Sequence, residues 1–319
     1  MALGGIVRIA VVFPGQGSQS IAMGCDVAQR SPAAAALFER AAALLGYDLL
    51  ALQREGPEEK LRETEFSQPA IFTTNLALYA AVGGAVEPIA TAGHSFAELC
   101  SLVIAGSLPF EDALRIVSER GKAMQSAAQR TRGGMSAVLG LTPAEVREVI
   151  AREHGSVALA NFNSPTQIVI SGHLEAVQAA GQAMLDAGAK RVIPLNVSGA
   201  WHSRLMEPAV ERLRVAVEAG RFAVPAFDVI SNVDGRPYRN VDVIKANLIR
   251  SVVDEVRWHD TAERILAYSP EIVVEFGASG VLSSLMKRME SAPLTIVVSD
   301  FAGVGRLRQA IERTAKASV

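Results

Sequence analysis

Ser95 lies in the segment GHSFAELC (93–100), where a serine separates a histidine from a large apolar residue. The residues before it, IATA, are typical of a short buried strand, and those after it are typical of the start of a helix. A serine on so sharp a turn has its hydroxyl exposed beside free helix N–H groups, as in the nucleophile elbow G-x-S-x-G. Alanine (Ala97) occupies the last glycine position here. Ser95 is therefore a candidate nucleophile, and an ordinary helix N-cap is the alternative.

A nucleophilic serine needs a base, because a neutral hydroxyl is a poor nucleophile. The chain has five histidines: His94, His154, His173, His202 and His259. His94 adjoins the serine, and adjacent residues on a turn seldom share a hydrogen bond. His154 and His173 are expected at polar helix ends, and His259 just before a helix cap. His202 is expected in a loop before a helix, where it could face the serine; a loop histidine without a catalytic role is the alternative.

The composition is that of an ordinary globular protein and excludes several functions. Of the 319 residues, 50% are hydrophobic and 20% charged, and the net charge is −2. No stripe of lysine and arginine stands out, so nucleic acid is not an expected partner. Cys25 and Cys100 lie far apart and outside any Cys/His cluster, which argues against a disulfide framework or a zinc site and suits a cytoplasmic location.

The sequence does not predict a signal peptide or a membrane span. Arg8 interrupts the apolar N-terminal run, and no small-residue cleavage site follows it. Residues 67–86 carry no charge over about the length of a membrane span. The polar residues 73–75, Pro69 and the glycine pair 83–84 instead favour a buried helix of about a dozen residues.

The rest of the chain predicts an α/β fold whose sheet is mostly parallel, because strands alternate with helices. Strands are expected at residues 6–13, 87–93, 271–276 and 294–299, and helices at 32–45 and 206–219. Gly46 is expected to end the first of these helices. Asp260 and Glu263 predict a further helix start, as a capping box.

The middle segment, residues 135–197, has a different order of elements. Its pattern predicts a strand, a helix beginning at a capping box and running to about residue 153, a hairpin, a second helix and a final strand over 191–197. The order β-α-β-β-α-β is that of the ferredoxin-like module. We therefore expect a catalytic core of residues 1–134 and 198–319, interrupted by a ferredoxin-like subdomain of residues 135–197.

Six segments taken together resemble one family. They are FPGQGSQ (13–19), GHSFAE (93–98), ERGKAMQ (119–125), NVSGAWHS (196–203), VRW (256–258) and VEFGASGVLSSLMKR (274–288). Their order resembles that of the malonyl-CoA:acyl carrier protein transacylases, the acyltransferases of fatty acid synthesis and of polyketide synthases. The resemblance covers nearly the whole chain and implies an α/β-hydrolase-like core with an inserted ferredoxin-like subdomain.

The resemblance also implies roles for the residues that could do chemistry. Ser95 would be the nucleophile and His202 its base, and the backbone N–H groups of Gln16 and Phe96 would form the oxyanion hole. A glycine-rich turn around Gln16 suits such a close approach of the backbone. A dinucleotide-binding fingerprint is the alternative at these glycines, but Ser20 stands where its third glycine is needed.

Three side chains would bind the substrate. Arg120 matches the arginine that grips the free carboxylate of the malonyl group, which a planar guanidinium can hold through two parallel hydrogen bonds; a solvated arginine is the alternative. Gln68 stands where the family commonly has a glutamine near the acyl pocket. Trp201 matches the position that is aromatic in malonyl-selecting enzymes and small in methylmalonyl-selecting ones, and Phe96 could also narrow the pocket. The alternative for Trp201 is packing without contact to the acyl group.

Several positions depart from the family pattern. Besides Ala97, Ser251 stands where a glutamine near the catalytic histidine is usual, Glu255 replaces a proline, and residues 277–279 read GAS instead of glycine-proline-glycine. None of these changes removes a catalytic group, but they leave open how His202 is held. They favour a discrete acyltransferase that serves a polyketide synthase assembly line in trans over a housekeeping enzyme of fatty acid synthesis.

The expected reaction is ping-pong transfer. Ser95 would take the malonyl group from malonyl-CoA, and the phosphopantetheine thiol of an acyl carrier protein would then accept it. No metal or other cofactor is expected. Two alternatives remain: an acyl hydrolase of the same fold that clears misloaded carrier proteins, which Arg120 disfavours, and a non-catalytic module that binds carrier proteins.

Overall fold

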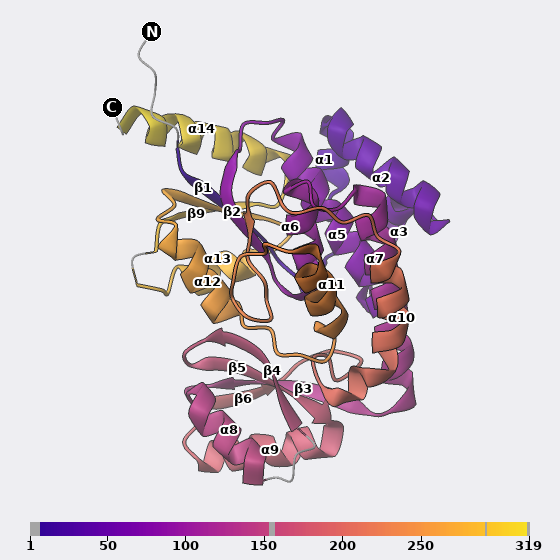
Figure 1. The fold of residues 1–319 in the computed structure, drawn as a ribbon, viewed down its shortest axis with the longest axis vertical. Helices are drawn as coiled ribbons and strands as arrows, with labels where there is room; N and C mark the ends of the chain where they lie inside the picture. The colour runs from indigo at the N-terminus through magenta and orange to yellow at the C-terminus, as the bar shows by residue number, and fades with distance from the viewer. Residues whose placement is uncertain (1–6, 153–156, 291, 318–319) are drawn as a thin grey trace.

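The computed structural model describes residues 7–152, 157–290 and 292–317 of the chain. Figure 1 shows a larger part, in which helices surround one sheet, and a smaller part below it, in which two helices lie against a second sheet. The predicted α/β fold with a parallel sheet is confirmed. The expected positions Ile6 and His154, and the end of the helix expected at about residue 153, lie outside the described residues.

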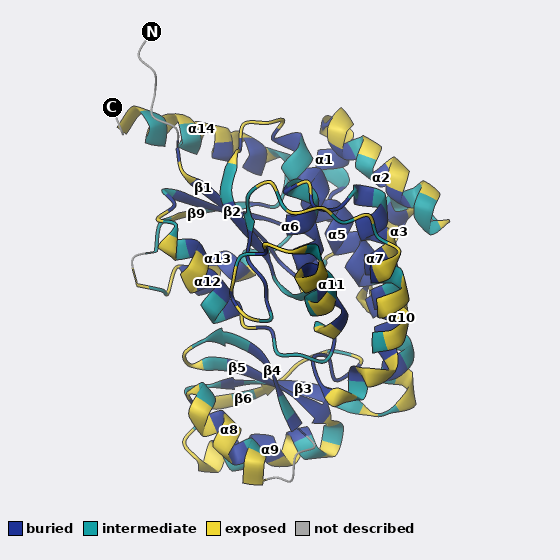
Figure 2. Ribbon diagram, viewed as in Figure 1, coloured by how far each residue is buried: buried dark blue, intermediate teal, exposed yellow. Residues whose placement is uncertain are grey.

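The sheet of the larger part is entirely parallel, in the order β7-β2-β1-β8-β9. Its strands are β1 (Ile9–Phe13), β2 (Pro88–Gly93), β7 (Asp228–Val229), β8 (Ile272–Phe276) and β9 (Leu294–Val298). Every residue of the central strand β1 is buried, as expected for a parallel strand covered on both faces. Figure 2 shows this buried centre beneath exposed helix surfaces. The carboxyl ends of β1 and β2 lie side by side, with Phe13 paired to Gly93.

Helices cover both faces of this sheet. They are α1 (Cys25–Arg30), α2 (Pro32–Leu45), α3 (Leu49–Glu55), α4 (Glu58–Arg62), α5 (Thr64–Ala81), α6 (Glu98–Ile104), α7 (Phe110–Arg130), α10 (Glu207–Glu218), α11 (Val241–Arg250), α12 (Trp258–Ala267), α13 (Val281–Met286) and α14 (Phe301–Ala317), with the 3₁₀ helices η1 (Ser95–Ala97) and η2 (Arg204–Met206). Alternate residues of β1 face opposite layers: Val11 packs in the large core with α5 and α6, and Val12 packs with α12 and α13.

Helix α5 contains most of the long uncharged stretch of the sequence. It spans 18 residues, so the expected helix of about a dozen residues was too short. Nearly all of it is buried, and it packs against α2 and α7. Within the described ranges, no helix is long and apolar enough to cross a membrane.

The smaller part contains an antiparallel sheet in the order β4-β5-β3-β6. Its strands are β3 (Gly133–Leu139), β4 (Val157–Ser164), β5 (Gln167–His173) and β6 (Arg191–Pro194), and its helices are α8 (Pro143–Arg152) and α9 (Leu174–Asp186). The predicted capping box before α8 is present, because the backbone N–H of Thr142 donates to the Glu145 carboxylate at 2.7 Å. A separate apolar core joins the two helices to the sheet.

Two expectations about element ends were wrong. The final strand of the smaller part ends at Pro194 instead of continuing to residue 197. The Leu195 N–H still donates to the Met135 carbonyl of β3, but the Val197 N–H donates back to the Leu195 carbonyl in a turn, and residues 195–197 line a cavity described below. The capping box expected at Asp260 is absent, since α12 already begins at Trp258 and places Asp260 in its first turn, paired with Arg257. His259, expected just before a helix cap, lies inside this helix.

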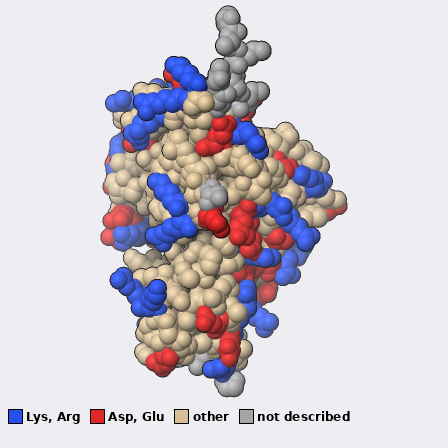
Figure 3. Space-filling model, turned by 90° about the vertical axis from the view of Figure 1, so that its left-hand side faces the viewer, with Lys and Arg blue, Asp and Glu red and all other residues tan. Residues whose placement is uncertain are grey.

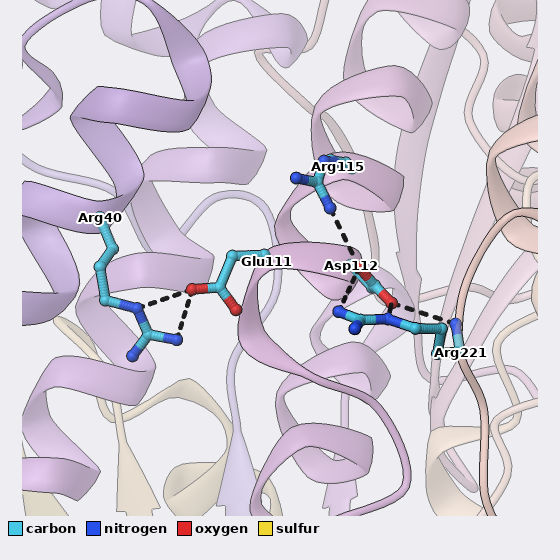
Figure 4. A network of polar contacts seen from close by, with 5 residues as sticks. All are labelled: Arg40, Glu111, Asp112, Arg115 and Arg221. Atoms are coloured by element: carbon cyan, nitrogen blue, oxygen red, sulfur yellow. Dashed lines mark hydrogen bonds and ion pairs between the residues drawn. The ribbon is translucent and has the colours of Figure 1, made fainter.

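The surface carries intermixed charges of both signs, as the face in Figure 3 shows. One network of such charges fixes the start of α7, which later in its length carries Arg120 (Figure 4). Arg40 of α2 pairs with Glu111, while Asp112 binds both Arg115 and Arg221. These pairs attach the first turn of α7 to α2 and to the segment after α10.

Candidate active site

Ser95 follows strand β2 at the start of η1, on the sharp strand-to-helix turn that the sequence predicts. Its φ angle is 56°, in the left-handed region that non-glycine residues rarely adopt and that costs about 1–3 kcal/mol. A Cβ atom at Gly93 would lie only 2.0 Å from the carbonyl oxygen of Ala97. The turn is therefore so tight that residue 93 must be glycine, whereas the alanine at residue 97 is accommodated.

His202 lies within hydrogen-bond distance of the serine. Its Nε2 atom is 2.9 Å from Ser95 Oγ, and its Nδ1 atom is 3.0 Å from the backbone carbonyl oxygen of Asp254. Because a carbonyl only accepts, Nδ1 carries the proton of the neutral ring and leaves Nε2 as an acceptor for the serine hydroxyl. His202 also has a positive φ, 57°, and its own N–H donates to the Val252 carbonyl.

The surroundings of His202 keep its ring neutral. Burial lowers the pKa of His202 to about 3, and the positive charge of Arg120 acts in the same direction. A histidine with this pKa is unprotonated at neutral pH, so its Nε2 lone pair can accept a proton. In its protonation state and its geometry, His202 fits a general base for Ser95.

Arg120 is a buried arginine beside the serine. Only 2% of it is exposed, so the alternative of a solvated arginine is wrong. Its Nη2 donates to Ser95 Oγ at 3.1 Å, whereas its Nε has no hydrogen-bond partner among the described residues. Burial lowers the pKa of Arg120 to about 9, partly offset by the nearby carboxylate of Glu98, so the guanidinium remains charged at neutral pH. A buried charge with donors to spare is suited to binding an anionic group.

These side chains meet at one cavity of about 550 Å³ that lies between the two parts of the molecule. The residues predicted from the sequence that line it are Gln16, Gln68, Ser95, Arg120, Trp201 and His202. Phe96 is buried and outside this lining, and its ring packs beside the Arg120 guanidinium. The expectation that the Phe96 ring narrows the pocket is therefore wrong, while its backbone N–H stays a candidate for the oxyanion hole.

Gln16 and Gln68 form a short chain of hydrogen bonds along the cavity. Gln68 Nε2 donates to Gln16 Oε1 at 3.3 Å, and Gln16 Nε2 donates to Thr64 Oγ1 at 3.1 Å. A Cβ at Gly15 would lie 2.6 Å from the carbonyl oxygen of His94, so the loop before Gln16 closely approaches the serine turn. Gln68 thus fixes the Gln16 side chain, and in the described part of the chain Gln68 Oε1 is buried without a partner.

Trp201 is 5% exposed and has two roles in packing. Its indole lines the cavity next to His202, and it also belongs to the large hydrophobic core. A Cβ at Gly199 would lie 2.7 Å from the indole ring, so the backbone at residue 199 is pressed against it. The ring is packed at the cavity wall, and its Nε1 atom has no hydrogen-bond partner within the described ranges.

Two of the departures from the family pattern concern the support of His202. The Ser251 hydroxyl donates to the Leu248 carbonyl at the end of α11. Glu255 pairs with Arg147 of α8 at 2.9 Å, which links the loop that carries Asp254 to the smaller part. His202 is oriented by the backbone carbonyl of Asp254, a contact that no residue type in the sequence could indicate.

Sequence reasoning missed a buried polar cluster behind the serine turn. The side chain of Asn232 accepts a hydrogen bond from the backbone N–H of Ser95, and the Glu98 carboxylate accepts hydrogen bonds from Asn232 and from the Tyr238 hydroxyl. In the part of the chain that the structure describes, no group of three or more His, Cys, Asp or Glu side chains could hold a metal ion.

An α/β fold with a serine at a strained turn, a neutral histidine beside it and a buried arginine in the same cavity is typical of enzymes that carry an acyl group on serine. The chain belongs to the acyl transferase domain family, whose model matches residues 10–311. The family predicted from the six sequence segments is thereby confirmed.

Three named proteins are similar to this chain over almost their whole length. The malonyl CoA-acyl carrier protein transacylase of Escherichia coli is 42% identical over 288 residues, which cover 89% of this chain and 93% of the relative. The crystal structure of an acyl carrier protein S-malonyltransferase from Vibrio cholerae is 37% identical, with a TM-score of 0.90 and coverage of 94% and 99%. A malonyl-transacylase in complex with a type II polyketide synthase acyl-carrier protein is 38% identical, with a TM-score of 0.91 and coverage of 95% and 99%.

Proposed function

We propose that this chain is a malonyl-CoA:acyl carrier protein S-malonyltransferase. It takes the malonyl group from malonyl-CoA onto Ser95 and passes it to the phosphopantetheine thiol of an acyl carrier protein, in polyketide or fatty acid synthesis. One observation carries the proposal: Ser95 Oγ contacts both a neutral histidine, at 2.9 Å, and a buried guanidinium, at 3.1 Å. The first contact suits acyl transfer through the serine, and the second suits an acyl group that ends in a carboxylate.

The first half-reaction forms the serine ester. His202 Nε2 takes the proton of Ser95 as Oγ attacks the thioester carbonyl carbon, and the negative charge develops on the carbonyl oxygen. The backbone N–H groups of Gln16 and Phe96 are proposed to stabilise that oxyanion. The carbon–sulfur bond then breaks, and the departing CoA sulfur takes the proton from His202 to leave as a thiol.

The second half-reaction reverses these steps with a different thiol. His202 accepts the proton of the phosphopantetheine thiol, whose sulfur attacks the acyl-serine carbonyl. The carbon–oxygen bond breaks, and His202 returns its proton to Ser95 Oγ. Arg120 holds the malonyl carboxylate during both steps, through the guanidinium at the cavity wall.

We further propose that residues 1–134 and 198–319 form an α/β-hydrolase-like core and that residues 135–197 form an inserted ferredoxin-like subdomain. The antiparallel sheet with two helices supports the insert, although β3 begins at Gly133. The insert contributes Asn161 to the cavity lining, so it would close the acyl pocket.

Intact-mass measurement tests the proposed function. The protein is incubated with malonyl-CoA and weighed, and a holo acyl carrier protein is then added. We expect a malonyl adduct that moves to the carrier protein. Release of free malonate without the carrier would indicate the acyl hydrolase, and the absence of any adduct would indicate the non-catalytic binding module.

The biological setting is a separate part of the proposal. A discrete enzyme that serves a polyketide synthase in trans should load polyketide carrier proteins with a higher kcat/KM than the carrier protein of fatty acid synthesis. A preference for the latter would assign the chain to fatty acid synthesis. The cytoplasmic location stays a prediction; the two cysteines that suggest it are both free.

Trp201→Ser is expected to reduce the preference for malonyl-CoA over methylmalonyl-CoA. An extra methyl group would have to displace the packed indole, and discrimination by one methyl is on the order of ten- to two-hundredfold. Competition between the two thioesters, with the acyl-serine identified by mass, measures the ratio. Trp201→Phe, which stays aromatic, should keep most of the preference. An unchanged ratio in Trp201→Ser would mean that the indole only packs, and a wild-type preference for methylmalonyl-CoA would contradict the substrate itself.

The acylation rate is expected to be nearly independent of pH from about pH 5 to about pH 8. Protonation of His202 would remove the base, but with a pKa of about 3 the free enzyme keeps it neutral over this range. When the malonyl carboxylate neutralises Arg120, one cause of the lowered pKa is removed. The acid limb of kcat should therefore lie at higher pH than that of kcat/KM. An acid limb of kcat/KM near pH 6.5 would show an unperturbed histidine and contradict this prediction.

A further inference from the structure

A buried polar cluster lies directly behind the serine turn. It consists of Glu98 in the first turn of α6, and Asn232 and Tyr238 in the segment between β7 and α11. All three side chains are almost fully buried. Burying polar groups costs folding free energy unless each one is hydrogen-bonded. The position of this cluster therefore suggests a role for it at the serine turn.

The side chain of Asn232 forms hydrogen bonds to both sides of the serine turn. Its Nδ2 donates to the carbonyl oxygen of Gly93 at 2.6 Å, and its Oδ1 accepts from the backbone N–H of Ser95 at 3.1 Å. One side-chain amide thus holds the last residue of β2 and the first residue of η1. The hydrogen bond from the Ser95 N–H depends on the left-handed conformation of Ser95, which orients that N–H toward Asn232.

Glu98 and Tyr238 in turn fix Asn232. The Glu98 Oε2 atom accepts from the Asn232 backbone N–H at 2.7 Å and from Asn232 Nδ2 at 2.5 Å. The Tyr238 hydroxyl donates to Glu98 Oε1 at 2.6 Å. The amide therefore cannot rotate without losing hydrogen bonds to the carboxylate, so the orientation of its Oδ1 toward Ser95 is determined.

Hydrogen bonds within and around the turn determine which of its backbone N–H groups already have an acceptor. The N–H of Ser95 donates to Asn232, and the N–H of Ala97 donates to the His94 carbonyl at 3.2 Å. The N–H of Phe96 lies between these two, in the first turn of η1, where helix N–H groups have no partner within the helix. With both flanking N–H groups engaged, the Phe96 N–H is the one that the proposed function assigns to the acyl oxygen.

We propose that Asn232, held by Glu98 and Tyr238, is the positioning residue that keeps Ser95 in its strained conformation and so aligns both the Ser95 hydroxyl and the Phe96 N–H for acylation. The proposal rests on the proposed function, in which Ser95 is the nucleophile. Asn232 itself touches no reacting atom and acts only through the backbone of the turn.

Asn232→Ala tests the role of the amide. Since a misplacement of about 1 Å can cost about a hundredfold, we expect the single-turnover rate of malonyl-serine formation to fall about 10- to 100-fold, while the dissociation constant of malonyl-CoA changes less than about threefold. Ser101→Ala is the matched control: Ser101 is likewise buried, it lies on α6, and among the described residues its hydroxyl bonds only to Thr91. We expect the control to lose stability without losing acylation rate.

Asn232→Asp provides a second test if the alanine variant fails to fold. The new carboxyl keeps the acceptor for Ser95 but faces Glu98, and two carboxyls at this distance share a proton at low pH. The other titratable groups near this pair are Tyr238, Asp234 and Arg120. We expect acylation close to the wild-type rate at low pH that declines as the pair loses its proton, whereas the wild-type rate stays level.

The outcomes separate this proposal from the function on which it rests. If the wild-type protein forms no malonyl adduct, the proposed function fails. If the wild type forms the adduct and Asn232→Ala acylates at the wild-type rate, the positioning role is overturned while the function stands. A pH profile of Asn232→Asp that runs parallel to the wild-type profile would overturn it as well.

Discussion

Ser95→Ala is expected to abolish both the malonyl adduct and the transfer of malonyl groups to a carrier protein. Every productive route passes through the serine ester, and alanine offers no oxygen to form it. Alanine changes little else, because the Ser95 hydroxyl contacts only His202 and Arg120 among the described residues. Intact mass after incubation with malonyl-CoA, together with a transfer assay, measures both effects.

His202→Ala should slow acylation by about a hundredfold to ten-thousandfold, since this is the usual contribution of a general base. His259→Ala is the matched control, because His259 lies on α12 and pairs with Glu263 there. We expect this control to acylate normally.

An adduct that accumulates on Ser95→Ala at the wild-type level would place the nucleophile elsewhere and contradict the assignment of the turn.

The elements that the sequence predicted correctly have local signals. Helix α2 begins where the Ser31 hydroxyl accepts the N–H of Ala34 and ends at Gly46, whose φ is 78°. The start of α12 was misplaced because burial of Trp258 overrides the local signal of Asp260. The predicted strand at β6 was too long, because the apolar pattern of the sequence continues into residues that line the cavity.

The candidate site, too, combines features that have a local sequence signal with contacts that have none. The turn at Ser95 and the loop before η2 carry recognisable residue patterns, so the sequence alone was enough to single out the serine and the histidine. The contacts that hold them could not be predicted in this way. Asn232 lies 137 residues from Ser95 in the chain, and the Asp254 contact is made by a backbone carbonyl. Neither residue type nor spacing indicates such contacts, because the folded sheet alone brings these segments together.

Arg120→Ala is expected to lower malonyl transfer on the order of a hundredfold. Losing a guanidinium that pairs with a sheltered carboxylate typically costs a few kcal/mol, which corresponds to a change of that size. Acetyl transfer should hold or rise, because a neutral acyl group loses no ion pair. Removing the positive charge also removes one cause of the low pKa of His202, which makes this base slightly stronger.

The comparison of malonyl transfer with acetyl transfer shows whether Arg120 recognises the carboxylate or has a structural role. Arg115→Ala is the matched control on the same helix: its side chain is 60% exposed and pairs with Asp112, as Figure 4 shows. We expect that variant to transfer both acyl groups at wild-type rates. The measurement is kcat/KM for malonyl-CoA and for acetyl-CoA with one carrier protein. An equal loss for both thioesters in Arg120→Ala would mean that the buried guanidinium supports Ser95 or the core, because a group that recognises the carboxylate must discriminate between acyl groups with and without one.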